Sequence, residues 1–148
     1  MRVTIRSGAI IPVLLMLPNV AWMLFPTPDA PPQRSVPLAL TIGENVSRVA
    51  ALGLPCFYSF ELTRKRATLA LVGMAIALAV YYAAWIRYFI GEQNPELLSA
   101  PLAGLPSPLA FAPIAVLAIS SYVLASRWML GAAAIFGALH VWTATLAN

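Results

Sequence analysis

Long apolar segments constrain this chain more than any other feature of its sequence. Five of them can be delimited, at roughly residues 8–25, 37–62, 67–90, 109–126 and 128–146. A helix needs about 17 to 25 mostly apolar residues to cross the hydrocarbon core of a bilayer. Only 9% of the residues are charged, whereas about a quarter are charged in a soluble domain. We therefore predict an all-α fold, a polytopic membrane helix bundle with five transmembrane helices that forms one domain over residues 1–148.

The first apolar segment follows two basic residues, as a signal peptide does. Pro12 and Pro18 interrupt it, however, and no small-x-small cleavage site follows Trp22. We expect this segment to remain in the protein as the first helix.

The orientation follows from the basic residues between the segments. One side of a five-helix arrangement receives Arg2, Arg6, Arg64, Lys65, Arg66 and Arg127, whereas the opposite side receives only Arg34, together with Asp29, Glu92 and Glu96. Basic residues gather in cytoplasmic loops. We therefore predict a multi-pass protein of the plasma (inner) membrane, with its N-terminus in the cytoplasm and its C-terminus outside.

Three connections have recognisable compositions. Residues 26–37, "PTPDAPPQRSVP", are too rich in proline for a helix. Residues 91–108 form the longest loop, which is half apolar, and we expect it to fold back over the helix ends. The few residues of "ASRWM", 125–129, predict an antiparallel hairpin of two helices.

The second apolar segment carries charged and polar residues close together. At about 100° per residue, Thr41, Glu44, Asn45 and Arg48 share one side of a helix. Glu44 and Arg48 are four residues apart and can meet one turn away. An Arg, Lys or Asp near the bilayer centre costs about 2.5 to 3.5 kcal/mol, so burial of both charges needs a structural or functional reason.

Other intramembrane polar groups are predicted at a similar depth. Asn19 follows Pro18 beyond the middle of the first helix, and His140 lies beyond the middle of the fifth. Since these helices run outward and the second runs inward, Asn19, Glu44, Asn45, Arg48 and His140 fall in the outer half of the membrane. We interpret them as one polar pocket that opens to the outside.

Two helix faces bear on this pocket. His140 shares a face with Ala133, Gly137 and Ala144, a small-residue stripe that suits close helix packing and directs the imidazole into the bundle. In the third helix Tyr81, Trp85 and Tyr88 form an aromatic stripe, which we include among the candidate ligand-binding residues.

Each feature also has a purely structural interpretation. Glu44 and Arg48 can be an ion pair that fixes helix packing. Asn19, Asn45 and His140 can form interhelical hydrogen bonds. The aromatic residues are more often typical of an interfacial belt than of a ligand cage.

Absent motifs narrow the field. With one histidine and one cysteine, Cys56, the chain offers no metal site of the usual kind and no internal disulfide. No phosphate-binding glycine loop and no nucleophile elbow is present. The scattered basic residues do not suggest nucleic acid as a partner. We predict no metal and no cofactor.

We favour a membrane protein that binds a small amphiphilic or anionic ligand. Arg48 and His140 would supply positive potential to the head group, and Glu44 and Asn45 would orient Arg48. The aromatic stripe would hold an apolar tail or ring.

Three alternatives stay open. As an accessory subunit, the chain would use the Glu44 and Arg48 face to contact a partner membrane protein. As a transporter, a chain of five spans without an internal repeat would need to form a homo-oligomer to supply a two-fold unit. As a small enzyme acting on a lipid or isoprenoid-like substrate, it would use Glu44 and His140 as catalytic acid and base. The enzyme requires these two groups within about 3 Å of a common substrate atom or bridging water. Membrane lipids are expected partners in every case.

Overall fold

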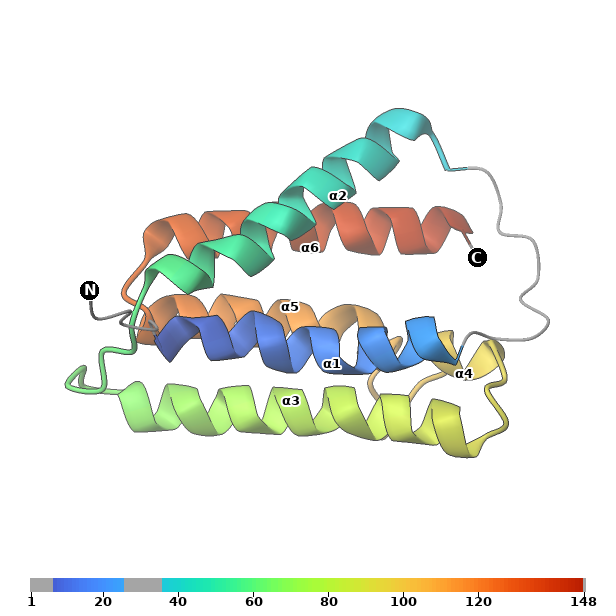
Figure 1. The fold of residues 1–148 in the computed structure, drawn as a ribbon, viewed down its shortest axis with the longest axis horizontal. Helices are drawn as coiled ribbons and strands as arrows, with labels where there is room; N and C mark the ends of the chain where they lie inside the picture. The colour runs from blue at the N-terminus through green and yellow to red at the C-terminus, as the bar shows by residue number, and fades with distance from the viewer. Residues whose placement is uncertain (1–6, 26–35, 148) are drawn as a thin grey trace.

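The regular elements in the part of the chain that the structure describes are all helices. The computed structural model describes residues 7–25 and 36–147 (Figure 1). The helices are η1 (Ser7–Ala9), α1 (Ile10–Leu24), α2 (Leu38–Gly53), η2 (Leu54–Phe57), α3 (Ala67–Ile90), α4 (Glu96–Ser99), α5 (Pro108–Val123) and α6 (Arg127–Ala147). The predicted all-α class is confirmed for these residues. The predictions that concern Arg2, Arg6, Asp29, Arg34 and most of the proline-rich connection fall outside them.

Three of the helical segments are long and apolar enough to cross a membrane. They are Ser7–Leu24, Ala67–Ile90 and Arg127–Leu146, which shows that membrane insertion suits this chain. The apolar helix Pro108–Val123 is shorter, so the predicted span at 109–126 is longer than the helix that forms there.

The predicted second span, 37–62, also extends too far. Its α-helix ends at Gly53, and the chain continues as a 3-10 helix only to Phe57. Pro55 supplies no backbone N–H to continue an α-helix and its ring crowds the preceding turn. The apolar residues beyond Phe57 belong instead to the connection before α3, because apolar composition alone does not reveal where a helix stops.

The helices α1, α2, α3, α5 and α6 alternate in direction along the chain (Figure 1). Residues 54–66 and 124–126 therefore lie at one end of the bundle, which we call the basic end because it carries Arg64, Lys65, Arg66 and, at the start of α6, Arg127. The other end of the bundle, which we call the opposite end, holds α4 and the C-terminal ends of α3 and α6.

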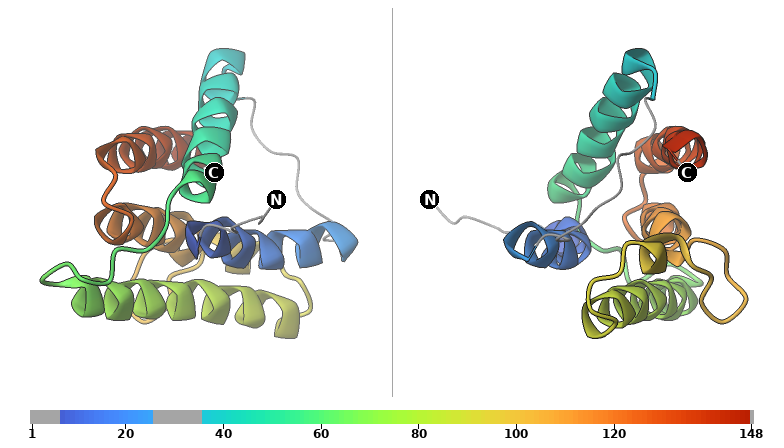
Figure 2. Two further views of the ribbon diagram at one scale, coloured as in Figure 1. Left: turned by 60° about the vertical axis from the view of Figure 1, so that its left-hand side comes forward. Right: turned by 90° about the vertical axis from the view of Figure 1, so that its right-hand side faces the viewer.

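Helix α5 lies between α3 and α6 and packs against both, while α2 packs on α6 and is inclined to the other helices (Figures 1 and 2). Small residues permit the close contacts. Gly137 is buried on α6, where a Cβ would lie 2.8 Å from Cγ2 of Ile114 on α5. Ala133, on the same face, is completely buried. The small-residue stripe predicted beside His140 therefore does serve helix packing.

The loop at the opposite end folds back against the helices, as predicted. Within it α4 contacts α3 and α5, and Nη1 of Arg87 donates a hydrogen bond to the Pro101 carbonyl at 2.8 Å. Arg87 thus ties the end of α3 to the loop that covers it.

The turn between α5 and α6 is a Schellman motif. The Ala125 N–H donates to the Tyr122 carbonyl at 3.2 Å, and the Ser126 N–H to the Ser121 carbonyl at 3.0 Å. Ala125 has φ of 51°, in the left-handed region that usually holds glycine at this position. The turn lets α6 reverse directly along α5, and it confirms the predicted helical hairpin.

Candidate functional site

A buried carboxylate joins α2 to α6. Glu44 is four residues before Arg48 on α2, and its Oε1 forms an ion pair with Nη2 of Arg48. The same oxygen lies 2.8 Å from Nδ1 of His140, and Oε2 accepts a hydrogen bond of 2.5 Å from the Thr143 hydroxyl. We call Glu44, Arg48, His140 and Thr143 the Glu44 network. Both carboxylate oxygens are therefore engaged by donors from two helices.

Helix periodicity explains why α6 supplies its partners from one side. Phe136, His140 and Thr143 are spaced by four and three residues, so they share a face. Phe136 stacks on the His140 imidazole with 5.2 Å between ring centroids, and the Arg48 guanidinium lies 5.8 Å from the Phe136 ring centroid. The aromatic ring thus holds both the imidazole and the guanidinium in place.

The two members of the ion pair differ in exposure. The side chain of Arg48 is 41% exposed, whereas that of Glu44 is 12% exposed. Asn45 is exposed beside them, and its Oδ1 is 3.5 Å from Nη1 of Arg48, which is long for a hydrogen bond. The network therefore buries its negative charge and presents its positive charge at the surface of α2.

A second polar group joins α1 to α3. The side-chain amide of Asn19 donates to the Tyr81 hydroxyl at 2.7 Å and to the Leu15 carbonyl at 2.9 Å. Tyr81 in turn donates to the Leu15 carbonyl at 3.0 Å. One turn of α1 is thus held by a buried tyrosine of α3.

Pro18 explains a neighbouring contact. The helical partner of the Leu14 carbonyl would be the N–H of residue 18, which proline lacks. The Tyr82 hydroxyl donates to this carbonyl at 2.9 Å and satisfies it. We call the contacts of Tyr81 and Tyr82 with α1 the tyrosine clamp.

The aromatic stripe of α3 lies in the core of the bundle. Tyr81, Trp85 and Tyr88 are all buried, and the Trp85 ring makes edge-to-face contacts with both tyrosines. Among the described residues, the Trp85 Nε1 atom is the one buried side-chain nitrogen or oxygen without a hydrogen-bond partner.

The predicted site residues thus fall into two groups. Glu44, Arg48 and His140 come together on α2 and α6, with Asn45 beside them. Asn19 joins Tyr81 on α1 and α3, and Trp85 and Tyr88 continue that group into the core. The first group joins α2 to α6, and Asn19 with Tyr81 joins α1 to α3.

Three contributors escape sequence reasoning, namely Thr143, Phe136 and Tyr82. The i, i+4, i+7 spacing from Phe136 through His140 to Thr143 is a signal for the first two, since it places them on the histidine's own face. The four-residue spacing between Leu14 and Pro18 predicts an unsatisfied carbonyl, but not which hydroxyl satisfies it.

Within residues 7–25 and 36–147, no cluster of three or more His, Cys, Asp or Glu side chains is placed to hold a metal ion. The donors and acceptors of the Glu44 network suit recognition of a polar group by charge and hydrogen bonds. No protein-family model, curated protein or solved structure matches this chain.

Proposed function

We propose that this chain is an integral membrane protein that binds a small amphiphile through an anionic or carbonyl-bearing head group at Arg48. In this proposal all five of the longer helices cross the membrane, with the basic end in the cytoplasm. Three candidate spans support it, as does the alternation of helix direction (Figure 1). The shorter α5, about 24 Å long at 1.5 Å per residue, is accommodated by local thinning of the bilayer.

The observation that carries the proposal is the exposed guanidinium of Arg48. A guanidinium has five N–H donors, and here one nitrogen faces Glu44 while another makes only a long contact with Asn45. A charged side chain in a membrane requires a partner for its unused donors. A carboxylate, phosphate or carbonyl oxygen supplies that partner with matching geometry.

Glu44 positions the Arg48 guanidinium for this contact. His140 and Thr143 hold the carboxylate in one position, and the carboxylate then holds the guanidinium. Little conformational entropy is left for the ligand to remove, which favours binding. The apolar part of the ligand would lie along the exposed side chains of Ile42 and Val49, which flank Asn45 on α2.

Native mass spectrometry of protein purified in mild detergent tests the proposal. Wild type is compared with Arg48→Met, and Lys65→Met is the control because it removes one positive charge from an exposed loop. We expect a discrete non-lipid mass on wild type and on the control, but not on Arg48→Met. Retention of that mass by Arg48→Met, with all three proteins folded, would refute the role of Arg48, as would bare wild type.

Asn45 favours a second candidate, in which the same face contacts a partner helix. Its amide is exposed on α2, and the exposed apolar side chains of Ile42 and Val49 lie one turn before and one turn after it. Asn side chains join helices in membranes by hydrogen bonds. A stoichiometric complex that dissociates on Asn45→Val but survives Thr145→Val, a change at an exposed site on α6, would favour this accessory or oligomeric role.

An acid/base enzyme is supported only by proximity, since His140 Nδ1 lies 2.8 Å from Glu44 Oε1 and the two groups contact each other directly. Both oxygens of Glu44 are nevertheless occupied by protein donors. A substrate would have to displace one of them before Glu44 could accept a proton. Ligand binding at Arg48 needs no such displacement, so it is the function that this geometry supports better.

A further inference from the structure

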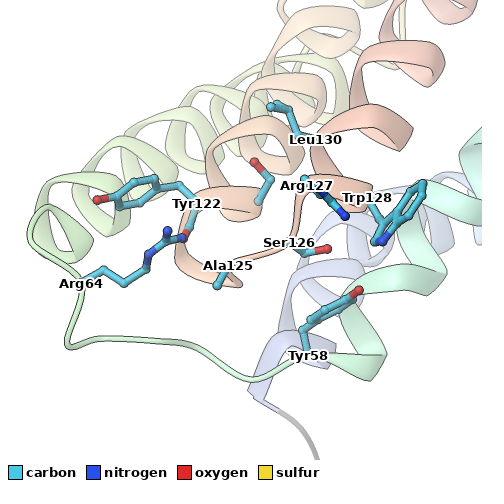
Figure 3. A pocket seen from close by; sticks show the side chains of 9 residues that line it. Tyr58, Arg64, Tyr122, Ala125, Ser126, Arg127, Trp128 and Leu130 are labelled. Atoms are coloured by element: carbon cyan, nitrogen blue, oxygen red, sulfur yellow. The ribbon is translucent and has the colours of Figure 1, made fainter.

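A cavity of about 490 Å³ lies at the basic end, and none of the residues of the Glu44 network lines it. Its walls include Tyr58 after η2, Arg64 before α3, and Tyr122, Ser126, Arg127 and Trp128 around the α5–α6 turn (Figure 3). Three separate segments thus combine to form it. The volume is within the range of about 300 to 1,000 Å³ that is typical of small-molecule sites.

Two guanidinium groups flank the cavity. Arg64 is held by a hydrogen bond of 2.5 Å from Nη1 to the Tyr122 carbonyl, and its Cζ lies 4.6 Å from the centroid of the Tyr122 ring. On the other side of the turn, Cζ of Arg127 lies 5.7 Å from the Trp128 ring centroid. Figure 3 shows the two arginines on either side of Ala125 and Ser126. Stacking on aromatic rings fixes guanidinium groups while leaving most of their N–H donors free.

No described carboxylate neutralises these arginines. Glu61 is the one acidic residue in 54–66 and 124–130, and it does not line the cavity. Within the described ranges, ion pairs closer than 4.0 Å involve only Glu44. The potential in the cavity is therefore positive.

The carbonyl groups at the end of α5 are already occupied, so they do not oppose an anion. Backbone or side-chain donors satisfy the carbonyls of Ser120, Ser121, Tyr122 and Val123. The start of α6 instead presents N–H groups at this end, since a helix leaves its first amides without internal partners. Of these N–H groups, the Met129 N–H donates a hydrogen bond to the Ser126 hydroxyl at 3.3 Å.

A tyrosine hydroxyl completes the set of donors. The Tyr58 hydroxyl forms no hydrogen bond with another described residue, and Figure 3 shows it directed toward the α5–α6 turn. The cavity therefore combines two fixed guanidinium groups, a helix N-terminus and a phenolic donor around one space. This combination matches the multiply accepting oxygens of phosphate.

We propose that this cavity binds a phosphate group, supplied either by the head group of an anionic phospholipid or by a soluble phosphate ester. Trp128 beside it is 69% exposed, and exposed tryptophans typically mark the head-group level of a membrane. The site involves none of the residues of the Glu44 network, so it stands independently of ligand binding at Arg48.

Lipid selection tests the first source. Protein is reconstituted in nanodiscs of equimolar phosphatidylglycerol and phosphatidylcholine, released gently, and examined by native mass spectrometry for retained lipid. We expect wild type to retain phosphatidylglycerol in roughly tenfold or greater preference. The double variant Arg64→Gln/Arg127→Gln should lose this preference, and each single variant should lose part of it. Lys65→Gln/Arg66→Gln removes the same charge from the same end and should keep it, as should Arg48→Met.

Inorganic phosphate tests the second source. If soluble phosphate esters are the ligands, millimolar phosphate should raise the unfolding temperature of detergent-solubilised wild type and of Lys65→Gln/Arg66→Gln, but not that of Arg64→Gln/Arg127→Gln. If the source is lipid, only phosphatidylglycerol should discriminate between these variants. The proposal is overturned if neither probe distinguishes wild type from Arg64→Gln/Arg127→Gln while both proteins are folded. It is equally overturned if the Lys65→Gln/Arg66→Gln control loses binding to the same extent.

Discussion

The tyrosine clamp gives a prediction that depends on the missing N–H of Pro18. Tyr82→Phe removes the hydroxyl that donates to the Leu14 carbonyl at 2.9 Å. With proline at position 18 no helical N–H replaces it, and no water in the hydrocarbon core does so either. An unsatisfied buried polar group costs about 1 to 3 kcal/mol, while measured hydrogen bonds between membrane helices average about 0.6 and reach about 1.7 kcal/mol. We therefore expect Tyr82→Phe to lower the free energy of unfolding by roughly 1 to 1.5 kcal/mol.

The same substitution should cost much less in a Pro18→Ala background. The backbone N–H that this change introduces can donate to the Leu14 carbonyl within α1, so loss of the tyrosine hydroxyl leaves no unsatisfied carbonyl. The double-mutant cycle of Tyr82→Phe with Pro18→Ala should therefore show a coupling energy of about 1 kcal/mol. The assay is reversible unfolding in mixed micelles of mild detergent and sodium dodecyl sulfate, followed by circular dichroism.

Tyr81→Phe is the matched control for this cycle. Its hydroxyl donates to the Leu15 carbonyl, which keeps its own helical donor, the N–H of Asn19, in either background. We expect Tyr81→Phe to cost the same in wild type as in the Pro18→Ala variant, within about 0.5 kcal/mol. If Tyr82→Phe also costs the same free energy of unfolding in both backgrounds, Pro18 is not the reason that the Leu14 carbonyl requires the Tyr82 hydroxyl. Our explanation of the clamp is then wrong.

Three further substitutions test other parts of the structure. Ala125→Gly should raise the free energy of unfolding by about 0.5 to 1 kcal/mol, because φ is 51° at this position and glycine adopts that conformation without a steric penalty; the same denaturation assay measures it. Thr143→Val removes a hydrogen bond to the charged Glu44 and should cost about 1.5 to 3 kcal/mol, whereas Thr145→Val, at an exposed site on the same helix, should stay within about 0.5 kcal/mol; equal effects would contradict the network. Gly8→Ala would place a methyl group 2.7 Å from the backbone carbonyl oxygen of Tyr58. It should therefore reduce the unfolding temperature measured by light scattering. An unchanged unfolding temperature would show that the contact between η1 and the segment after η2 is loose.

Helix composition and spacing predict much of the architecture. The third segment is predicted at 67–90 and the helix spans Ala67–Ile90, because a polar, basic connection precedes it and Gly91 follows it. The second segment is predicted too long, since the apolar residues after Phe57 look the same in sequence whether they continue a helix or pack at its end. The Glu44 and Arg48 contact is also predictable, as it depends only on the four-residue spacing within one helix.

Contacts between helices are harder to predict from the sequence. Periodicity places His140 on an inward face but does not show which helix faces it, so its contact with Glu44 requires the structure. The prediction of one polar pocket assumes that polar residues at a similar depth in the membrane also lie close to one another. Depth fixes one coordinate only, and α2 with α6 and α1 with α3 form separate pairs around α5.

The contact of Glu44 with α6 also has a consequence for biogenesis. Helix α2 ends at Gly53 and α6 begins at Arg127, so ribosomes complete α2 long before its partners His140 and Thr143 exist. Until then the nascent chain holds a carboxylate whose α6 donors are missing, and only Arg48, one turn away, offsets its charge. Stable packing of α2 should therefore wait until α6 has been synthesised, which makes the pairing of these two helices a late step in assembly of the bundle.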